Sequence, residues 1–292
     1  MSREERRVPK EEEAAINGFV AKLENRWQLD NFVCVGLDTE FGKLPEVFRE
    51  YTSKAEALVS FNKDIVDATH DLVCAYKPNA AFYEALGREG WDALFNTIDY
   101  IKTTYPDIPV ILDAKRGDIG STNEAYATAV FDGLKADAVT VHPYFGQEAL
   151  KPFLDRKDKG IIIMASNSNP GAGEFQDLPI GDTGEPLYKI VAKNIAENWN
   201  SNGNCAVTVG ATFPGKISQV RSVVGDMPLL VLGVGQQGGE VEPTIKAAKD
   251  SRGWGMIVNS TRAIIYASNS EDYKEASRAA TMKLRTEINR FR

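Results

Sequence analysis

Histidine is scarce in this chain, with only His70 and His142 among 292 residues. Such a low count argues against a histidine-based catalytic triad and against a metal site built from several histidines. Cysteine is also rare, and the three cysteines do not form a cluster with metal-ligand spacing. Because their number is odd and their spacing wide, they argue against a disulfide framework and predict a reducing cytoplasmic location.

Long apolar runs are absent too, and none approaches the roughly 20 residues that a membrane-spanning helix needs. The first residues, MSREERRVPKEEE, are charged and lack the apolar core of a signal peptide. The formal net charge of −7 disfavours nucleic acid as a partner, because a phosphate backbone requires an excess of Lys and Arg. A small anionic ligand needs only a few local donors and therefore remains open.

Short apolar runs alternate along the chain with longer amphipathic segments, which is typical of βαβ units and a parallel sheet. The final segment, residues 271–290, has helical periodicity. Because eight such units favour a closed barrel, we predict an α/β fold, a single (β/α)8 TIM barrel. The eight expected strands are Phe32–Leu37, Val73–Tyr76, Val110–Leu112, Ala138–His142, Ile161–Ala165, Ala206–Val209, Leu229–Leu232 and Met256–Val258.

No linker or change in composition divides the chain, so we predict one domain over residues 1–292, with residues 1–13 as a frayed or flexible leader. The polar segment Asn167–Glu185 is rich in Gly, Asn, Asp and Pro. It is long for a simple connection, and we predict that it forms a lid or a binding loop.

The third expected strand ends in a cluster of charges, in the sequence VILDAKRGDIGST. Asp113 and Lys115 are two residues apart, so they share one face if the strand stays extended, whereas Asp118 lies beyond it in the turn. Two carboxylates and an ammonium suit a reaction that moves a proton or develops charge. The alternative is a solvated turn that caps the next helix with Ser121 or Thr122.

Polar residues follow several other expected strands on the side where TIM barrels place their active sites. A glycine-rich loop, GVGQQGG, follows the seventh strand, and an arginine follows the eighth; backbone N–H groups and a guanidinium together predict a phosphate site. Each residue alone could be a turn residue or a helix cap. The residues at these strand ends are Asp38, Lys77, Ser168, Gln237 and Arg262.

These motifs together resemble the orotidine 5′-monophosphate decarboxylase family, in the form common in bacteria. The resemblance rests on DAKRGDIGST with its Asp-x-Lys-x-x-Asp core, and on AYKPN, NPG, GVGQQGG and the final arginine, in that order from about Asp38 to Arg262. It implies a decarboxylase of pyrimidine biosynthesis that uses no cofactor and no metal, acts on a nucleotide and forms a homodimer.

The resemblance also implies roles for individual residues. Lys115 would protonate C6 of the pyrimidine, Asp113 would lie beside the scissile carboxylate, and Lys77 would hold Asp113. Asp118 and Thr122 would enter the site of the partner subunit. The remaining residues would bind substrate: Asp38 the ribose, Ser168 the pyrimidine edge, and Gln237 and Arg262 the 5′-phosphate.

Two other functions remain open on the sequence. A Mg-dependent sugar-phosphate decarboxylase or aldolase of the same superfamily shares the Asp-x-Lys-x-x-Asp element. This chain, however, has Lys77 where such enzymes carry an acidic ligand, and an ammonium there would repel Mg²⁺. A non-catalytic phosphate-binding barrel would bind the ligand without turnover.

Overall fold

The eight expected strands form one parallel sheet in a computed structural model that describes residues 18–234 and 239–292. Their order in the sheet is β2-β1-β10-β9-β8-β5-β4-β3, and bridges from Tyr76 to Val110 and from Asn79 to Asp113 close it between β2 and β3. The predicted TIM barrel is therefore confirmed, whereas the predicted leader lies outside the described residues. The strands are β1 (Val33–Gly36), β2 (Val73–Lys77), β3 (Ile111–Arg116), β4 (Ala138–Val141), β5 (Gly160–Ile163), β8 (Cys205–Gly210), β9 (Leu229–Leu232) and β10 (Met256–Ser260).

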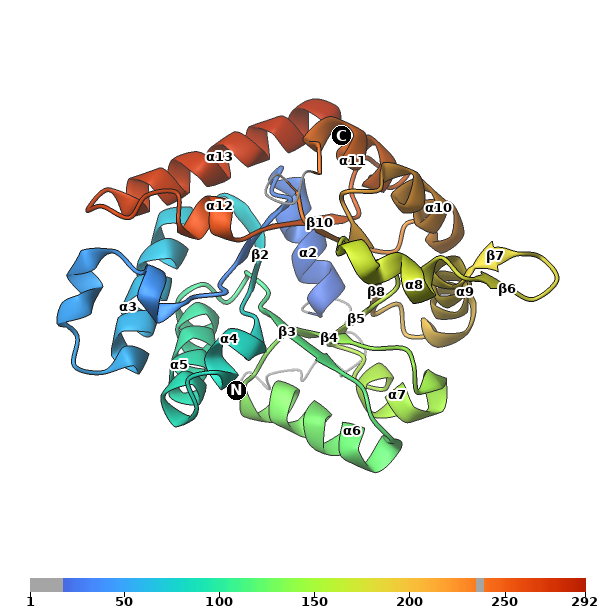
Figure 1. Ribbon diagram of the computed structural model, residues 1–292, viewed down its shortest axis with the longest axis horizontal. Helices are drawn as coiled ribbons and strands as arrows, with labels where there is room; N and C mark the ends of the chain where they lie inside the picture. Colours follow the sequence, from blue (N-terminus) through green and yellow to red (C-terminus); the bar gives the residue numbers. More distant parts are fainter. Residues whose placement is uncertain (1–17, 235–238) are drawn as a thin grey trace, which may run out of the picture.

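A ring of helices surrounds these strands (Figure 1), so that the sheet is covered on its outer face. The strand residues are almost all buried, which explains why they appear in the sequence as continuous apolar runs rather than as an alternating pattern. The predicted C-terminal helix is confirmed as α13. The helices of the ring are α3 (Lys54–Thr69), α4 (Ala80–Glu84), α5 (Arg88–Thr104), α6 (Gly120–Ala127), α7 (Gly146–Leu154), α9 (Leu187–Asn194), α10 (Pro214–Val224), α11 (Val241–Ala248), α12 (Arg262–Ile265) and α13 (Tyr273–Phe291).

Helix α3 illustrates how the local sequence determines these elements. Ser53 caps its N-terminus, since the side-chain oxygen accepts a hydrogen bond from the Glu56 N–H. Leu58, Phe61 and Ile65 follow at helical spacing and are fully buried. The helix thus presents one mainly apolar stripe to the barrel, in which the polar residues Asn62 and Thr69 are also buried.

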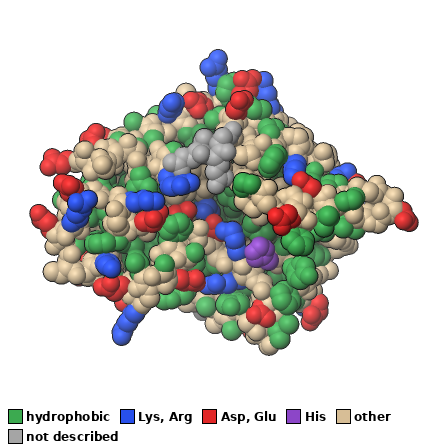
Figure 2. Space-filling model, viewed as in Figure 1, with side chains coloured by type: hydrophobic (Ala, Val, Ile, Leu, Met, Phe, Trp, Pro, Cys, Tyr) green, Lys and Arg blue, Asp and Glu red, His purple; other side chains and the backbone are tan. Residues whose placement is uncertain are grey.

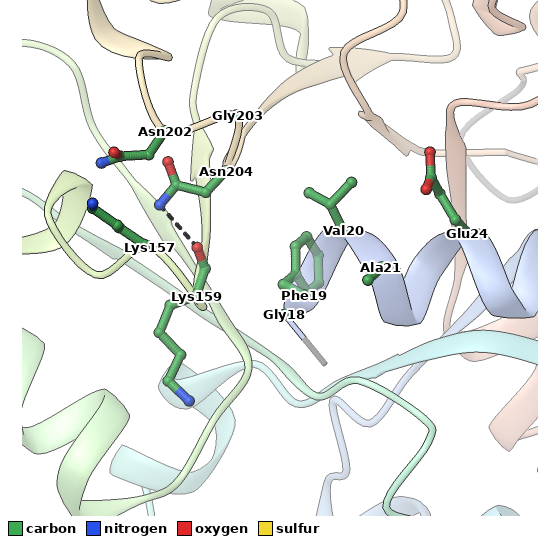
Figure 3. A pocket seen from close by; sticks show the side chains of 10 residues that line it. All are labelled: Gly18, Phe19, Val20, Ala21, Glu24, Lys157, Lys159, Asn202, Gly203 and Asn204. Atoms are coloured by element: carbon green, nitrogen blue, oxygen red, sulfur yellow. Dashed lines mark hydrogen bonds between the residues drawn. The ribbon is translucent and has the colours of Figure 1, made fainter. Parts of the chain in front are cut away.

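A further helix, α2 (Phe19–Gln28), lies at the amino ends of the strands. The Phe19 ring packs directly against Gly160, the first residue of β5. A Cβ at this position would lie 2.1 Å from the ring, so the packing of α2 requires glycine there. A cavity of about 440 Å³ opens beside this helix (Figure 3), and Asn204 Nδ2 donates a hydrogen bond to the Lys159 carbonyl at its wall. The lining residues outside α2 and Gly18 directly precede β5 and β8, so the cavity lies at the opposite end of the barrel from the charged strand ends.

The segment predicted as a lid has local structure of its own. It contains a 3-10 turn (Pro170–Ala172), α8 (Gly173–Gln176) and a hairpin of β6 (Pro179–Ile180) and β7 (Glu185–Pro186), which extends away from the barrel in Figure 1. Gln176 Oε1 accepts a hydrogen bond from the Asn167 N–H at 2.9 Å, which ties the segment to the end of β5. Its role as a lid stays a prediction.

Among the helices of the two described ranges, none is both long enough and apolar enough to span a membrane.

Candidate active site

Lys77, Asp113 and Lys115 form one ion-paired group at the carboxyl ends of β2 and β3. Lys77 Nζ lies 2.9 Å from Asp113 Oδ2, and Lys115 Nζ lies 2.5 Å from Asp113 Oδ1. Lys77 is 2% exposed and Asp113 is 6% exposed, whereas the Lys115 side chain is 38% exposed. One carboxylate therefore bridges a buried ammonium and an ammonium that faces the mouth of the barrel.

The backbone at Lys115 brings this side chain to Asp113 in an unexpected way. The sequence predicted that both residues share a face of an extended strand, but Lys115 has a φ of 47°, in the left-handed region. The register between β3 and β4 also shifts between Leu112 and Arg116. The two side chains do meet, but the backbone is not extended at Lys115, so the condition on which the sequence analysis placed them on one face is not met. Left-handed backbone at a residue other than glycine is costly and concentrates at functional sites.

The electrostatics of the group favour the charged forms of Lys77 and Asp113. Burial raises the pKa of Asp113, but the Lys77 and Lys115 ammoniums outweigh it and hold this pKa well below its usual range. Burial lowers the pKa of Lys77, yet Asp113 and Asp38 raise it overall. Asp38 differs, because burial raises its pKa and Lys77 Nζ, 4.0 Å away, opposes this only in part.

Thr140 belongs to this group, although the sequence analysis missed it. Its hydroxyl donates to Asp113 Oδ1 and accepts from the Lys115 N–H, both at 2.9 Å. It therefore fixes the carboxylate and also the strained backbone of Lys115. The only signal in the sequence was one hydroxyl within the apolar run of β4, and such a residue on a buried strand is more often a satisfied structural group.

A cavity of about 200 Å³ brings Lys77 and Asp113 together with other predicted site residues, whereas Lys115 is not among the residues that line it. Asp38, Ser168 and Arg262, which follow β1, β5 and β10, line it together with Lys77 and Asp113. In Figure 2 this face of the molecule is hollowed near its middle, with charged side chains of both signs around the hollow. Gln237 lies outside the described residues. The cavity is also lined by Leu232, Gly233, Val234, Asn259, Ser260 and Thr261.

Asp118 and Thr122 lie apart from this cavity. Asp118 Oδ1 accepts a hydrogen bond from the Ile119 N–H, and within the described residues it forms no ion pair with Lys77 or Lys115. Helix α6 begins at Gly120 without a side-chain cap, so the alternative in which Ser121 or Thr122 caps it is wrong. The turn is instead held by Asn123, whose amide donates to the carbonyls of Asp118 and Ala149.

Metal ligands do not converge in the described part of the chain, where no group of three His, Cys, Asp or Glu side chains could hold an ion. Asp113, the first carboxylate of the Asp-x-Lys-x-x-Asp element, is in contact with the Lys77 ammonium. Nothing in this arrangement favours the Mg-dependent alternative.

Comparisons with known proteins agree with this geometry. The model of the orotidine 5′-phosphate decarboxylase / HUMPS family matches residues 31–278. The chain is 49% identical over 272 residues to the orotidine 5′-phosphate decarboxylase of Cellvibrio japonicus, covering 93% of this chain and 98% of that protein. The corresponding protein of an Azoarcus species is 47% identical over 275 residues, covering 94% and 99%.

Among solved structures, the OMP decarboxylase of Leishmania donovani superposes with a TM-score of 0.81 at 36% identity, covering 94% of this chain and 98% of that one. A similarity of this kind extends over the whole barrel rather than over one motif. The chain belongs to the orotidine 5′-phosphate decarboxylase family.

Proposed function

We propose that this protein decarboxylates orotidine 5′-monophosphate to uridine 5′-monophosphate, a step of pyrimidine biosynthesis, without a cofactor. The observation that carries the proposal is the Lys77–Asp113–Lys115 group at the strand ends, in which Lys77 and Asp113 are buried. In a solvated turn, charged side chains would be exposed to water, whereas here Lys77 is 2% exposed and Asp113 is 6% exposed. A catalytic site does require charges that are fixed in advance.

The chemistry divides between the two ends of this group. Loss of CO2 leaves an electron pair on a vinyl carbon, C6, which no neighbouring group can delocalise. An ammonium at that carbon stabilises the charge as it develops and then supplies the proton. Lys115 suits this role because its side chain reaches the mouth of the barrel, while Lys77 stays buried and holds Asp113 in position.

The remaining residues suit the binding of the rest of the nucleotide. Asp38 and Ser168 line the cavity after different strands, β1 and β5, which suits contacts to the ribose and to the pyrimidine edge. Arg262, with Gln237, would hold the 5′-phosphate, since a guanidinium pairs strongly with phosphate oxygens. Binding energy from this remote group can orient the reacting end of the substrate.

A homodimer completes the proposal, with Asp118 and Thr122 in the site of the partner subunit. Asp118 does not reach its own chain's charged group. Large apolar side chains are exposed on the turns after the neighbouring strands β3 and β4, with Ile119 at 57% and Tyr144 at 93% exposure. Exposed large apolar residues on neighbouring turns suit a protein interface, and a two-fold dimer would give two equivalent composite sites. The cytoplasmic location stays a prediction; the three cysteines are free and buried.

The direct test is an ultraviolet assay for loss of orotidine 5′-monophosphate, run on the wild type and on Lys115→Ala. We expect the variant to lose at least the roughly 10²–10⁴-fold that a positioned acid contributes, while it still binds the product. Lys151→Ala is the matched control, because that lysine is exposed in a surface ion pair. Activity of Lys115→Ala within tenfold of the wild type would rule out the proton-donor role.

The shared site is tested by mixing Lys115→Ala with Asp118→Ala, each nearly inactive alone. Random exchange makes half the dimers mixed, and one of their two sites has both residues intact, so about a quarter of wild-type activity should return. If Asp118 acts within its own chain, every site keeps a defect and mixing restores nothing. Differently tagged chains, purified together, establish that the subunits exchange.

A further inference from the structure

Two oxygen atoms in the walls of the active-site cavity are buried without a hydrogen-bond donor. They are Asp38 Oδ1 and Asn259 Oδ1, and no described group donates to either. Asn259 is only 9% exposed. Burying such an oxygen unpaired is unfavourable, so acceptors that persist in a cavity indicate that a ligand brings the donor.

The orientation of the Asn259 amide follows from its neighbours. A Cβ on Gly36 would lie 1.9 Å from Thr261 Oγ1, so the glycine leaves the space into which the Thr261 side chain packs. The Asn259 Nδ2 group donates to that hydroxyl at 3.4 Å. With the nitrogen turned toward Thr261, the amide oxygen is the atom left for the cavity.

The position of Asn259 in the barrel indicates which part of a nucleotide it meets. Strand β10 pairs with β1, the strand that Asp38 follows, and Arg262 comes three residues after Asn259. Ser168 follows β5, which is separated from β10 by β8 and β9. Asn259 therefore lies at the side of the cavity that carries Asp38 and Arg262, away from the residue suited to the pyrimidine.

An amide oxygen needs a donor, and an ionised phosphate has none to offer. The donors of a nucleotide near its phosphate are the ribose hydroxyl groups. We propose that Asn259 is a further substrate-binding residue, whose amide oxygen accepts a hydrogen bond from a ribose hydroxyl, and that Thr261 is the positioning residue that orients it. This inference rests on the proposed function, since it takes the ligand to be a ribonucleotide.

The test measures binding of the product, so that it does not depend on turnover. Dissociation constants are determined by calorimetry for uridine 5′-monophosphate and for its 2′-deoxy and 3′-deoxy forms. Asn259→Leu keeps the side-chain volume and removes the acceptor. We expect it to weaken binding of the ribonucleotide about 3- to 12-fold, the range of one neutral hydrogen bond. For the deoxy form that lacks the partner hydroxyl, wild type and variant should agree within twofold.

Asn198→Leu, at an exposed position, is the control for the substitution itself. The inference is overturned if Asn259→Leu binds all three nucleotides like the wild type, or if it weakens all three equally, because the latter is a purely structural effect. If Asn259→Leu does not fold, Thr261→Val serves instead, because it removes the hydroxyl that accepts from the Asn259 Nδ2 group and keeps a similar shape. Its loss of nucleotide binding must then depend on the same single ribose hydroxyl. A wild type that binds these nucleotides but does not consume orotidine 5′-monophosphate would instead refute the proposed function.

Discussion

Replacing Lys77 by methionine should destabilise the whole barrel, and not only its chemistry. The ammonium is 2% exposed and lies 2.9 Å from Asp113 Oδ2. Methionine fills a similar volume but leaves the carboxylate of Asp113, itself 6% exposed, with Lys115 and Thr140 as its partners. A buried charge that loses an ion-pair partner retains its full desolvation penalty.

The magnitude follows from this geometry. Removing one partner of a buried ion pair costs about 3–5 kcal/mol. For a barrel of this size that corresponds to a fall in Tm of roughly 6–20 °C, at roughly 2–4 °C per kcal/mol. We place the expected value near the lower end, because Lys115 Nζ still contacts Asp113 Oδ1 at 2.5 Å.

Calorimetry and urea unfolding at pH 7 would measure the effect, with two comparisons. Lys151→Met makes the same substitution in an exposed i,i+4 ion pair and should change stability by less than about 1 kcal/mol. Lys77→Met combined with Asp113→Asn removes both charges and should recover at least half of the loss. If Lys77→Met is as stable as Lys151→Met, or if the double variant is less stable than Lys77→Met, the reasoning about the buried pair is refuted.

Two further predictions concern the same site. Arg262→Ala should weaken binding of the nucleotide and leave the bare nucleoside nearly unaffected, and equal losses in the two titrations would place Arg262 away from the phosphate. The pKa of Asp113 is lower in the folded state than in the unfolded state, where it is about 3.9. The ionised Asp113 carboxylate therefore stabilises the fold fully above about pH 3.9, and this contribution is lost as the pH falls through the folded-state pKa. The difference in unfolding free energy between wild type and Asp113→Asn should therefore be constant from pH 7 to 5 and shrink below about pH 4. Urea unfolding at each pH measures this difference, and a gap between the two urea midpoints that widens on acidification would contradict the prediction.

The barrel could be predicted from the sequence because each strand is an apolar run bounded by polar turns, and a count of eight favours a closed barrel over a doubly wound sheet. The charged residues of the site were equally visible, since Asp38, Lys77 and Asp113 each stand at the end of such a run. The carboxyl ends of the strands of a parallel barrel meet at one face, so residues that directly follow the strands in the sequence come close together in space.

The contacts inside the site could not be predicted in the same way. The positive φ of Lys115 depends on how β3 shifts against β4, which no local pattern encodes. The roles of Thr140 and Asn259 depend on which hydroxyl and amide of a strand face inward, and on what lies opposite. A polar residue within an apolar strand indicates a buried polar group, but only the packed structure shows whether the group is satisfied.

Two aspartates show why that distinction separates structure from function. Asp137 precedes β4 at the amino end of the barrel, and its buried carboxylate is fully paired with Lys22, Lys102 and the Val110 N–H. Asp38 follows β1 at the carboxyl end, and one of its oxygens accepts no hydrogen bond. Both residues adjoin an apolar strand and look alike in the sequence. A fully paired carboxylate needs no ligand and holds the fold together. A buried carboxylate oxygen in a cavity that accepts no hydrogen bond, with the Lys77 ammonium only 4.0 Å away, instead indicates binding. In this barrel the two acceptors without a hydrogen bond in the strand-end cavity, Asp38 Oδ1 and Asn259 Oδ1, lie where the substrate is proposed to bind.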